Sequence, residues 1–135
     1  MPEPTADRPW LAAYPPGVPA DAEVPDLSVT ELLDRAARDL PNRVAVDFGG
    51  RRTSYAELAD AVERAAQVLR ECGVGRGDRV ALVLPACPQH VVAFHAALRA
   101  GAVVAEHDPL VPPAELAARL GRHPDAVLVA WDRVA

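Results

Sequence analysis

The chain has 135 residues, 50% of them apolar and 24% charged, which is ordinary for a globular domain. Its net charge of −5 and its scattered arginines argue against nucleic-acid binding, which needs basic residues gathered on one face. All 14 basic residues are arginine, so the chain offers neither a Schiff-base lysine nor the phosphate-binding lysine of a P-loop. No apolar run is long enough to span a membrane, and the N-terminus does not look like a secretory signal. We therefore expect a cytoplasmic protein without a transmembrane segment.

Residues 1–27 are rich in proline, which interrupts helices and central strands, so we predict an extended arm. Trp10, Leu11 and Tyr14 lie between the prolines and favour an arm that rests on a surface. Helix and strand patterns begin after this arm, and residues 28–135 are predicted to form one α/β segment.

Two capping boxes predict helix starts, because in each a serine is followed three residues later by a glutamate. Ser28 and Glu31 start a helix that Pro41 ends, and Ser54 and Glu57 start a longer one. The apolar stripe of the first helix is Val29, Leu32, Leu33, Ala36, Ala37 and Leu40. The inner face of the second is Leu58, Ala59, Val62, Ala65, Ala66 and Leu69.

A β-hairpin is predicted near residues 44–54, where Gly49 and Gly50 supply a tight turn between two alternating runs. Beyond it, apolar strands alternate with helical patterns. The strands are expected at 79–84, 102–105 and 126–131, and the helices from Pro88 to Gly101 and over 114–122. This order predicts an α/β fold with a mostly parallel sheet and flanking helices.

Gly73, Gly75 and Gly77 form a glycine cluster that resembles a nucleotide-binding loop. A dinucleotide-binding loop runs from a strand through its glycines into a helix, so that the phosphates meet the helix N-terminus. Here the glycines follow a helix and precede a strand. We therefore interpret them as a helix end and a tight turn.

Glu106, His107 and Asp108 follow a predicted strand, at the sheet edge where ligands of parallel sheets gather. A histidine beside carboxylates is a candidate general base, and the alternative is a polar loop in which Asp108 starts a turn. His90 and His95 are five residues apart, so we do not expect them to act as paired metal ligands on one helix face. Each is instead expected to be a partly exposed helix residue.

The remaining candidates have structural explanations. His123 precedes a proline and is expected to be solvated in a loop. Ser28 and Ser54 are the only serines and are explained as helix caps, without a nucleophile elbow. Cys72 lies at a helix C-terminus, where the helix dipole disfavours a thiolate, and with Cys87 it is expected to be a free thiol.

Four stretches, taken in order, resemble the adenylate-forming enzyme superfamily, which includes the AMP-forming acyl-CoA synthetases. They are RTSYAEL at 52–58, GVGRGDRVAL at 73–82, LPACPQ at 84–89, and the helix-to-strand stretch at 92–103. Each stretch alone is a weak signal, whereas their order and spacing together are fairly specific.

Within this superfamily, the chain resembles the N-terminal segment of bacterial long-chain fatty acid–CoA ligases. The resemblance lies in PWL at 9–11, YPPGVP at 14–19, QHVVAF at 89–94 and EHDPL at 106–110. The chain departs from the family at Asp108, where asparagine is usual, and at 111–113, where a tyrosine-bearing turn is common.

The resemblance implies an enzyme that converts a carboxylic acid and Mg-ATP into an acyl-adenylate and pyrophosphate, and then transfers the acyl group to coenzyme A. It also implies that the phosphate loop and the catalytic glutamate, aspartate and lysine lie beyond residue 135. We therefore assign no catalytic, cofactor-binding or metal-binding residue to this chain. Residues 28–135 are expected to be part of the N-terminal adenylation domain, inactive alone, and to pack against the remainder of that domain or to self-associate.

Two alternatives remain open from the sequence. A stand-alone α/β module that docks a partner without catalysis fits the same strand and helix pattern. A small nucleotide-binding oxidoreductase is disfavoured by the order of helix, glycines and strand around residues 73–77.

Overall fold

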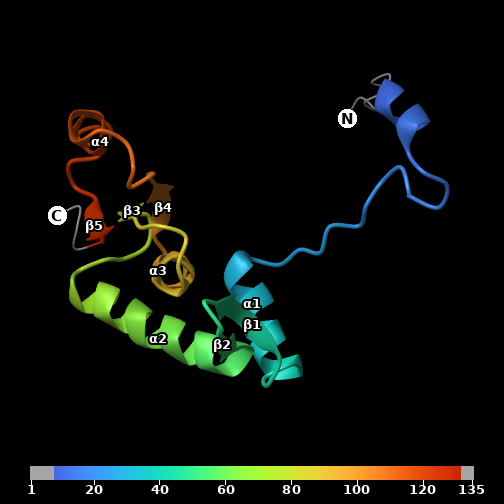
Figure 1. Cartoon of the computed structure of the whole chain (residues 1–135), viewed down its shortest axis with the longest axis horizontal. Helices are drawn as coiled ribbons and strands as arrows, with labels where there is room; N and C mark the ends of the chain where they lie inside the picture. The colour runs from blue at the N-terminus through green and yellow to red at the C-terminus, as the bar shows by residue number, and fades with distance from the viewer. Residues whose placement is uncertain (1–7, 132–135) are drawn as a thin grey trace.

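The computed structural model describes residues 8–131, which form four α-helices, five strands and one short 3-10 helix (Figure 1). Residues 1–7 of the predicted arm and residues 132–135 of the predicted α/β segment lie outside the described residues. In chain order the elements are η1 (Pro9–Ala13), α1 (Val29–Asp39), β1 (Val44–Phe48), β2 (Arg51–Ser54), α2 (Tyr55–Glu71), β3 (Arg79–Val83), α3 (Pro88–Arg99), β4 (Val103–Glu106), α4 (Pro113–Leu120) and β5 (Val127–Ala130).

Both predicted capping boxes are confirmed. At the start of α1, the Glu31 amide donates to Ser28 Oγ (3.3 Å) and the Ser28 amide donates to the Glu31 carboxylate (2.7 Å). At the start of α2, the Glu57 amide donates to Ser54 Oγ (3.3 Å) and the Ser54 amide donates to the Glu57 carboxylate (2.8 Å). Each box satisfies two amides that the first helical turn leaves without carbonyl partners.

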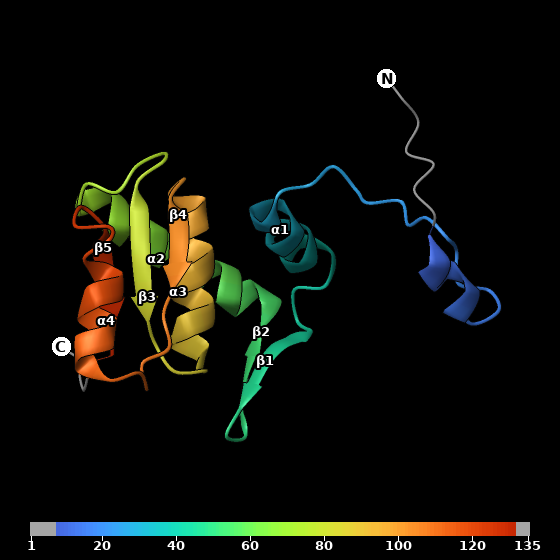
Figure 2. The same ribbon diagram turned by 90° about the horizontal axis from the view of Figure 1, so that it is seen from above.

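The predicted hairpin is formed by β1 and β2, which pair antiparallel as a two-stranded sheet of their own. Gly49 and Gly50 join the strands with φ angles of 58° and 81°, a left-handed conformation that glycine adopts without a steric penalty. Asp47 and Arg52 are paired in register and form an ion pair of 3.1 Å. The hairpin projects from the N-terminal end of α2 (Figure 2).

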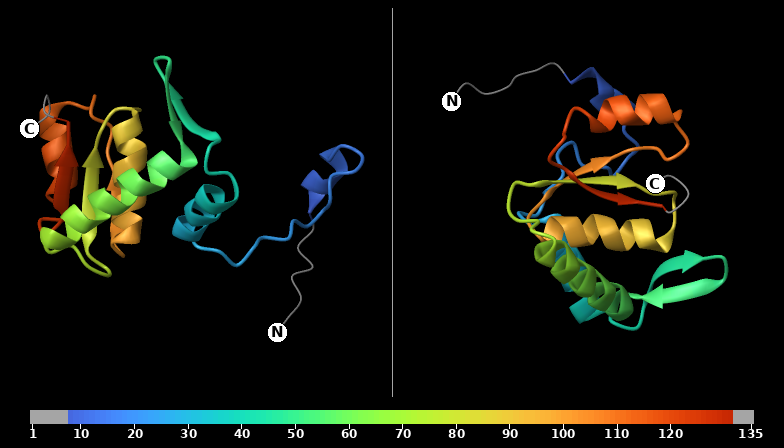
Figure 3. Two further views of the ribbon diagram at one scale, coloured as in Figure 1. Left: turned by 90° about the horizontal axis from the view of Figure 1, so that it is seen from below. Right: turned by 90° about the vertical axis from the view of Figure 1, so that its left-hand side faces the viewer.

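The other three strands form a parallel sheet in the order β4-β3-β5, as the alternating pattern predicts. The chain reaches β4 through α3 and β5 through α4, and these two helices lie on opposite faces of the sheet (Figure 3). β3 is central, and residues 80–83 are all buried because it has a strand on each side and helices on both faces. The predicted α/β fold with a parallel sheet and flanking helices is therefore confirmed.

The core lies on the side of the parallel sheet that α2 and α3 cover. Ala66, Ala96 and Ala97 are completely buried there, and their small side chains allow α2 and α3 to pack closely. Larger side chains of α2 and β3 fill the remaining space. The buried members of the core are Leu33, Leu58, Val62, Ala66, Leu69, Val74, Val80, Leu82, Ala96, Ala97, Ala100 and Ala102.

Arg99 on α3 connects three helices. Its guanidinium pairs with Asp34 on α1 and with Glu63 on α2 (3.4 Å). Arg70 on α2 pairs with Glu63 (3.2 Å) and donates to the backbone carbonyl of Arg99 (3.0 Å). Because Leu33 is the one buried residue that α1 contributes within the described chain, these polar contacts help to hold α1 against α2 and α3.

Residues 14–27 of the arm contain no helix or strand, as predicted, and the arm differs from its prediction in two other ways. Pro9–Ala13 form a turn of 3-10 helix instead of extended chain, because a proline in a first helical turn lacks only an amide that has no partner there. Trp10 and Tyr14 are exposed, and the arm extends away from the α/β segment instead of resting on it (Figures 1 and 3).

The apolar stripe predicted for α1 is only partly buried. Leu33 faces the core, whereas Val29, Leu32 and Leu40 are about half exposed, because the described residues cover a single side of this helix. Both ends of three further elements also move by one or two residues from the expected positions, as is usual where terminal hydrogen bonds decide them. β4, α4 and β5 cover Val103–Glu106, Pro113–Leu120 and Val127–Ala130 instead of 102–105, 114–122 and 126–131.

Candidate functional site

The carboxyl ends of β3 and β4 form the place in the fold that best suits a binding site. From β3 the chain passes to α3 on one face of the sheet, and from β4 it passes to α4 on the other (Figure 3). The turn after β3 and the end of β4 border one groove, which we call the crevice, at the carboxyl edge of the sheet where ligands of open α/β sheets bind.

His90 and Glu106 meet at this crevice. His90 lies in the first turn of α3 and Glu106 is the last residue of β4, and the imidazole Nε2 lies 2.6 Å from a Glu106 carboxylate oxygen. The pair borders this groove, of about 610 Å³, between the hairpin and α3. The apolar lining of this groove consists of Val46, Phe48, Ala86, Pro88, Val91 and Phe94. The sequence reasoning missed this pair, although parallel strands end at one edge, which places the end of β4 beside the turn after β3.

His95 borders the same groove, farther along α3. Burial lowers the pKa of His95, and the positive charge of Arg99 lowers it further, so the imidazole is neutral at pH 7. Its buried Nδ1 has no hydrogen-bond partner among the described residues. The prediction that His90 and His95 are partly exposed helix residues is confirmed, but the two share a groove despite their five-residue spacing.

The predicted cluster of Glu106, His107 and Asp108 is not arranged as a general-base site. Glu106 pairs with His90, and Asp108 accepts a hydrogen bond from the Leu110 amide (2.8 Å). Both carboxylates are thus directed to groups other than the His107 imidazole. The bond to Leu110 is the side-chain turn that an Asp-Pro sequence predicts, so the alternative reading of this loop is confirmed.

His107 and His123 border a second hollow, of about 490 Å³, beside α4. His123 lies in a loop, as expected, and its side chain is partly exposed at the edge of this hollow. The His123 amide donates to the Leu120 carbonyl (2.9 Å), and its side chain is half-buried. Glu115 and Arg119 of α4 line the same hollow.

Gly73, Gly75 and Gly77 reverse the chain between α2 and β3, as predicted. Gly73 ends α2 with a φ of 88°, the usual role of glycine after a helix. The Gly75 amide donates to the Asp78 carboxylate (2.7 Å), and the Gly77 amide donates to the Gly101 carbonyl (3.0 Å). Because these amides are engaged and the turn follows the negative end of the α2 dipole, it does not suit a phosphate.

The remaining candidate side chains are explained by the fold. Ser28 and Ser54 cap α1 and α2, and Cys72 and Cys87 are free thiols. Across residues 8–131, no group of three or more histidine, cysteine, aspartate or glutamate side chains is placed to hold a metal ion. No helix in this described range combines the length and apolar character needed to cross a membrane.

The arrangement at the crevice therefore supplies an apolar groove bordered by a histidine and a carboxylate in contact. Group transfer requires a nucleophile, a base and a group that stabilises developing charge at one place. The described residues bring together an imidazole, a carboxylate and an apolar groove. Such a set does not by itself form a complete reaction centre.

Comparison with known proteins assigns the chain to a family. The pattern of the AMP-binding enzyme family matches residues 33–134. The long-chain-fatty-acid–CoA ligase of Bacillus subtilis is 31% identical over 127 residues, which are 94% of this chain and 23% of the ligase. The ligase of the same name from Salmonella typhimurium is 34% identical over 123 residues, which are 89% of this chain and 22% of that protein. The chain thus spans less than a quarter of the length of these relatives.

The fold agrees with this assignment. The N-terminal subdomain of NpsA from Klebsiella oxytoca superposes with a TM-score of 0.72 and 27% identity, over 77% of this chain and 27% of that one. The resemblance to adenylate-forming enzymes is confirmed by sequence and by structure. The chain belongs to the AMP-binding enzyme family of adenylate-forming ligases.

Proposed function

We propose that the chain is the N-terminal part of the adenylation domain of a long-chain fatty acid–CoA ligase. In the proposed reaction, the whole enzyme uses Mg-ATP to activate a long-chain carboxylic acid as its adenylate with release of pyrophosphate, and coenzyme A then displaces AMP to give the acyl thioester. The observation that carries the proposal is the family match over residues 33–134 together with the identity to two ligases of this name. A cytoplasmic location is part of the same proposal.

No step of this reaction is assigned to a residue of the described chain. The residues present do not fit the phosphates of ATP, because the glycine turn lies at the carbonyl end of α2 and two of its amides are bound within the protein. We propose instead that the segment is scaffold, with the sheet and the α2–α3 core positioning parts of the enzyme that lie outside this chain.

An ATP–pyrophosphate exchange assay tests whether this segment is scaffold and the catalytic residues lie elsewhere in the enzyme. The 135-residue chain incubated with palmitate should show no exchange above a protein-free control, whereas the protein encoded by the whole reading frame should show palmitate-dependent exchange and acyl-CoA formation. Robust exchange by the chain alone would refute the scaffold role. A stop codon directly after residue 135 would replace the ligase proposal with a stand-alone interaction module.

We also propose a partner for the two edges of the parallel sheet. This partner is the rest of the adenylation domain, or a second copy of the chain when that domain is absent. β4 and β5 are the two edges of the sheet, and strand edges carry backbone groups that can pair with another strand. Val103 on β4 and Leu128 on β5 are about half exposed. Apolar side chains beside an open edge favour association.

The thermal unfolding of the isolated chain should therefore depend on its concentration, because association stabilises the folded state by mass action. Leu128→Lys should reduce this dependence by placing a charge at the edge, whereas Leu110→Lys, in a loop where Leu110 is 84% exposed, should leave it unchanged. Calorimetric scans over a wide concentration range make the measurement. A midpoint that does not move with concentration would contradict the proposed partner surface.

A further inference from the structure

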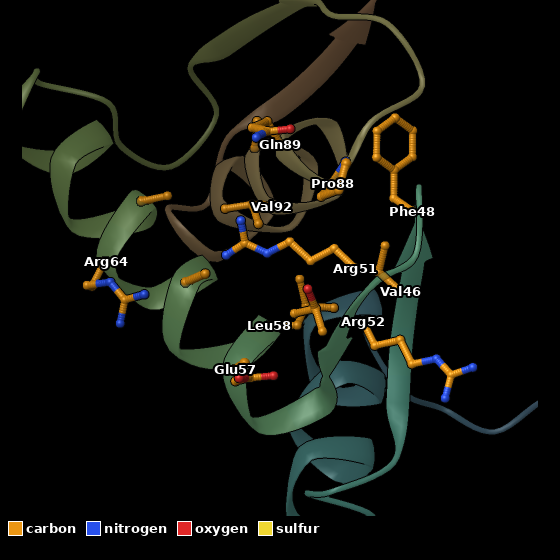
Figure 4. Close-up of a pocket in the computed structure, with 14 residues that line it drawn as sticks. Val46, Phe48, Arg51, Arg52, Glu57, Leu58, Arg64, Pro88, Gln89 and Val92 are labelled. Atoms are coloured by element: carbon orange, nitrogen blue, oxygen red, sulfur yellow. The ribbon is translucent and has the colours of Figure 1, made fainter.

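A larger hollow adjoins the groove at His90 and extends between the hairpin, α2 and α3 (Figure 4). We call it the hairpin cavity. Its volume is about 790 Å³, inside the range of about 300–1,000 Å³ that small-molecule sites occupy. Val46, Phe48 and Pro88 border both this cavity and the groove.

The floor of the hairpin cavity is aliphatic. Leu58, Ala61 and Ala65 come from α2, and Val92 and Ala93 come from α3. Leu58 belongs to the core, and the other four are half-buried, so they present apolar surface at the bottom of the hollow. A hydrocarbon chain lying along this floor would remove from water both its own apolar surface and that of the floor.

Three arginines line the same cavity: Arg51, Arg52 and Arg64. Figure 4 shows Arg51 reaching from β2 across the cavity toward α3, near Val92. Arg64 contributes a second positive charge from α2. Among residues 8–131, no ion pair or hydrogen bond engages the guanidinium of either residue. Arg52, the next residue of β2, points to the opposite side and pairs with Asp47 (3.1 Å).

Glu57 is the one acidic residue that lines the hairpin cavity in the described chain. Its carboxylate is held at the start of α2 by the Ser54 amide (2.8 Å) and hydroxyl (2.9 Å). These bonds lower the pKa of Glu57, and the charge of Arg51 adds a smaller effect in the same direction. With Arg52 paired to Asp47, the other two guanidinium groups and one engaged carboxylate leave the cavity positively charged.

We propose that the hairpin cavity binds a single-chain amphiphilic anion, with its aliphatic tail between α2 and α3 and its carboxylate or phosphate at Arg51 and Arg64. The planar guanidinium group donates paired hydrogen bonds to either kind of oxyanion. The proposal does not rest on ligase activity, because it uses only the shape, apolar floor and charge of the hairpin cavity.

The same surface does not suit a membrane or a nucleic acid. Anionic membranes attract clusters of about four to eight basic residues, and nucleic acids attract a basic face. The hairpin cavity offers three arginines in a concave site, one of them paired with Asp47, in a chain whose net charge is −5. A dissolved amphiphile fits this combination, because its tail can enter the hollow while its head group stays at the rim.

Titration of the 135-residue chain with dodecanoate, kept below its micelle-forming concentration, tests the proposal. Backbone amide signals in NMR spectra should shift for Leu58, Ala61, Val92 and Ala93. Arg51→Gln should raise the dissociation constant about three- to tenfold, and the double variant with Arg64→Gln should raise it further, because each change removes a charge-assisted bond to the head group.

Arg52→Gln is the matched control, because Arg52 also lines the cavity but its guanidinium points away from α3 and is engaged with Asp47. It should leave the dissociation constant within about twofold, as exposed ion pairs contribute little. Equal effects of Arg51→Gln and Arg52→Gln would overturn the proposal. So would shifts confined to residues outside the hairpin cavity.

Two further ligands separate the possible sources of the anion. Dodecyl phosphate should compete with dodecanoate at the same residues, and an uncharged dodecyl maltoside should bind at least about tenfold more weakly, because it lacks the oxyanion. Equal binding of the maltoside would overturn the charged part of the site. Binding to phosphatidylglycerol vesicles without binding of dodecanoate would overturn the proposal in favour of a membrane surface.

Discussion

Replacing Leu82 by alanine should lower the free energy of unfolding by about 2–5 kcal/mol, the usual cost of deleting a buried leucine side chain. Leu82 is 1% exposed and lies on the central strand β3, where its side chain belongs to the core beneath α2 and α3. The loss is a large share of the roughly 5–15 kcal/mol that stabilises a typical domain. Urea titration followed by circular dichroism gives the measurement.

Leu110→Ala provides the matched control, because the same side chain is removed from a loop position that is 84% exposed. It should change the free energy of unfolding by no more than about 0.5 kcal/mol, as surface substitutions usually do. If Leu82→Ala cost as little as Leu110→Ala, the central position of β3 in the core would be wrong.

The parts of the fold that the sequence predicted well depend on local chemistry. A capping box needs a serine and a glutamate three residues apart, and both boxes formed at Ser28 and Ser54. The hairpin turn needs two residues with positive φ, and the pair at Gly49 and Gly50 supplied them. β3 is a continuous apolar run, and such a run predicts a strand that is buried on both faces, as β3 is.

The candidate site was harder to predict because it joins residues that are distant in sequence. His90 and Glu106 are separated by 16 positions, and they meet only because α3 returns the chain to a parallel neighbour of β3. Arg51 and Arg64 lie on different elements, and they border one cavity only because the hairpin projects beside α2. The periodicity of apolar residues in one sequence does not predict which residues from distant elements come into contact.

The errors in the arm and in α1 have a related cause. Apolar residues at Trp10, Tyr14, Val29 and Leu32 predict burial, yet all four are substantially exposed in the described residues. Composition reports that a side chain prefers an apolar contact without stating where that contact is. These residues therefore add to the surfaces for which we propose the rest of an adenylation domain as a partner.

The second large effect is expected at Gly101, which joins α3 to β4 with a φ of 89°. An alanine there would adopt a left-handed backbone, at a cost of about 1–2 kcal/mol. Its Cβ would also lie 3.2 Å from the Cα of Arg76, a backbone atom that cannot move aside as a flexible side chain would. The Gly101 carbonyl accepts the Gly77 amide (3.0 Å), so displacement of either turn disturbs the other.

Gly73→Ala isolates the contribution of the close contact. Gly73 has nearly the same φ, 88°, but an added Cβ there meets no heavy atom within 4 Å, so this variant should lose only the backbone cost. Gly101→Ala should be less stable than Gly73→Ala by a further 1 kcal/mol or so, the lower end of the usual cost of overpacking. Urea titrations of the two variants provide the comparison. Equal losses would show that the turns at Gly77 and Gly101 separate without cost, and that their packing does not hold the α2–β3 connection against the start of β4.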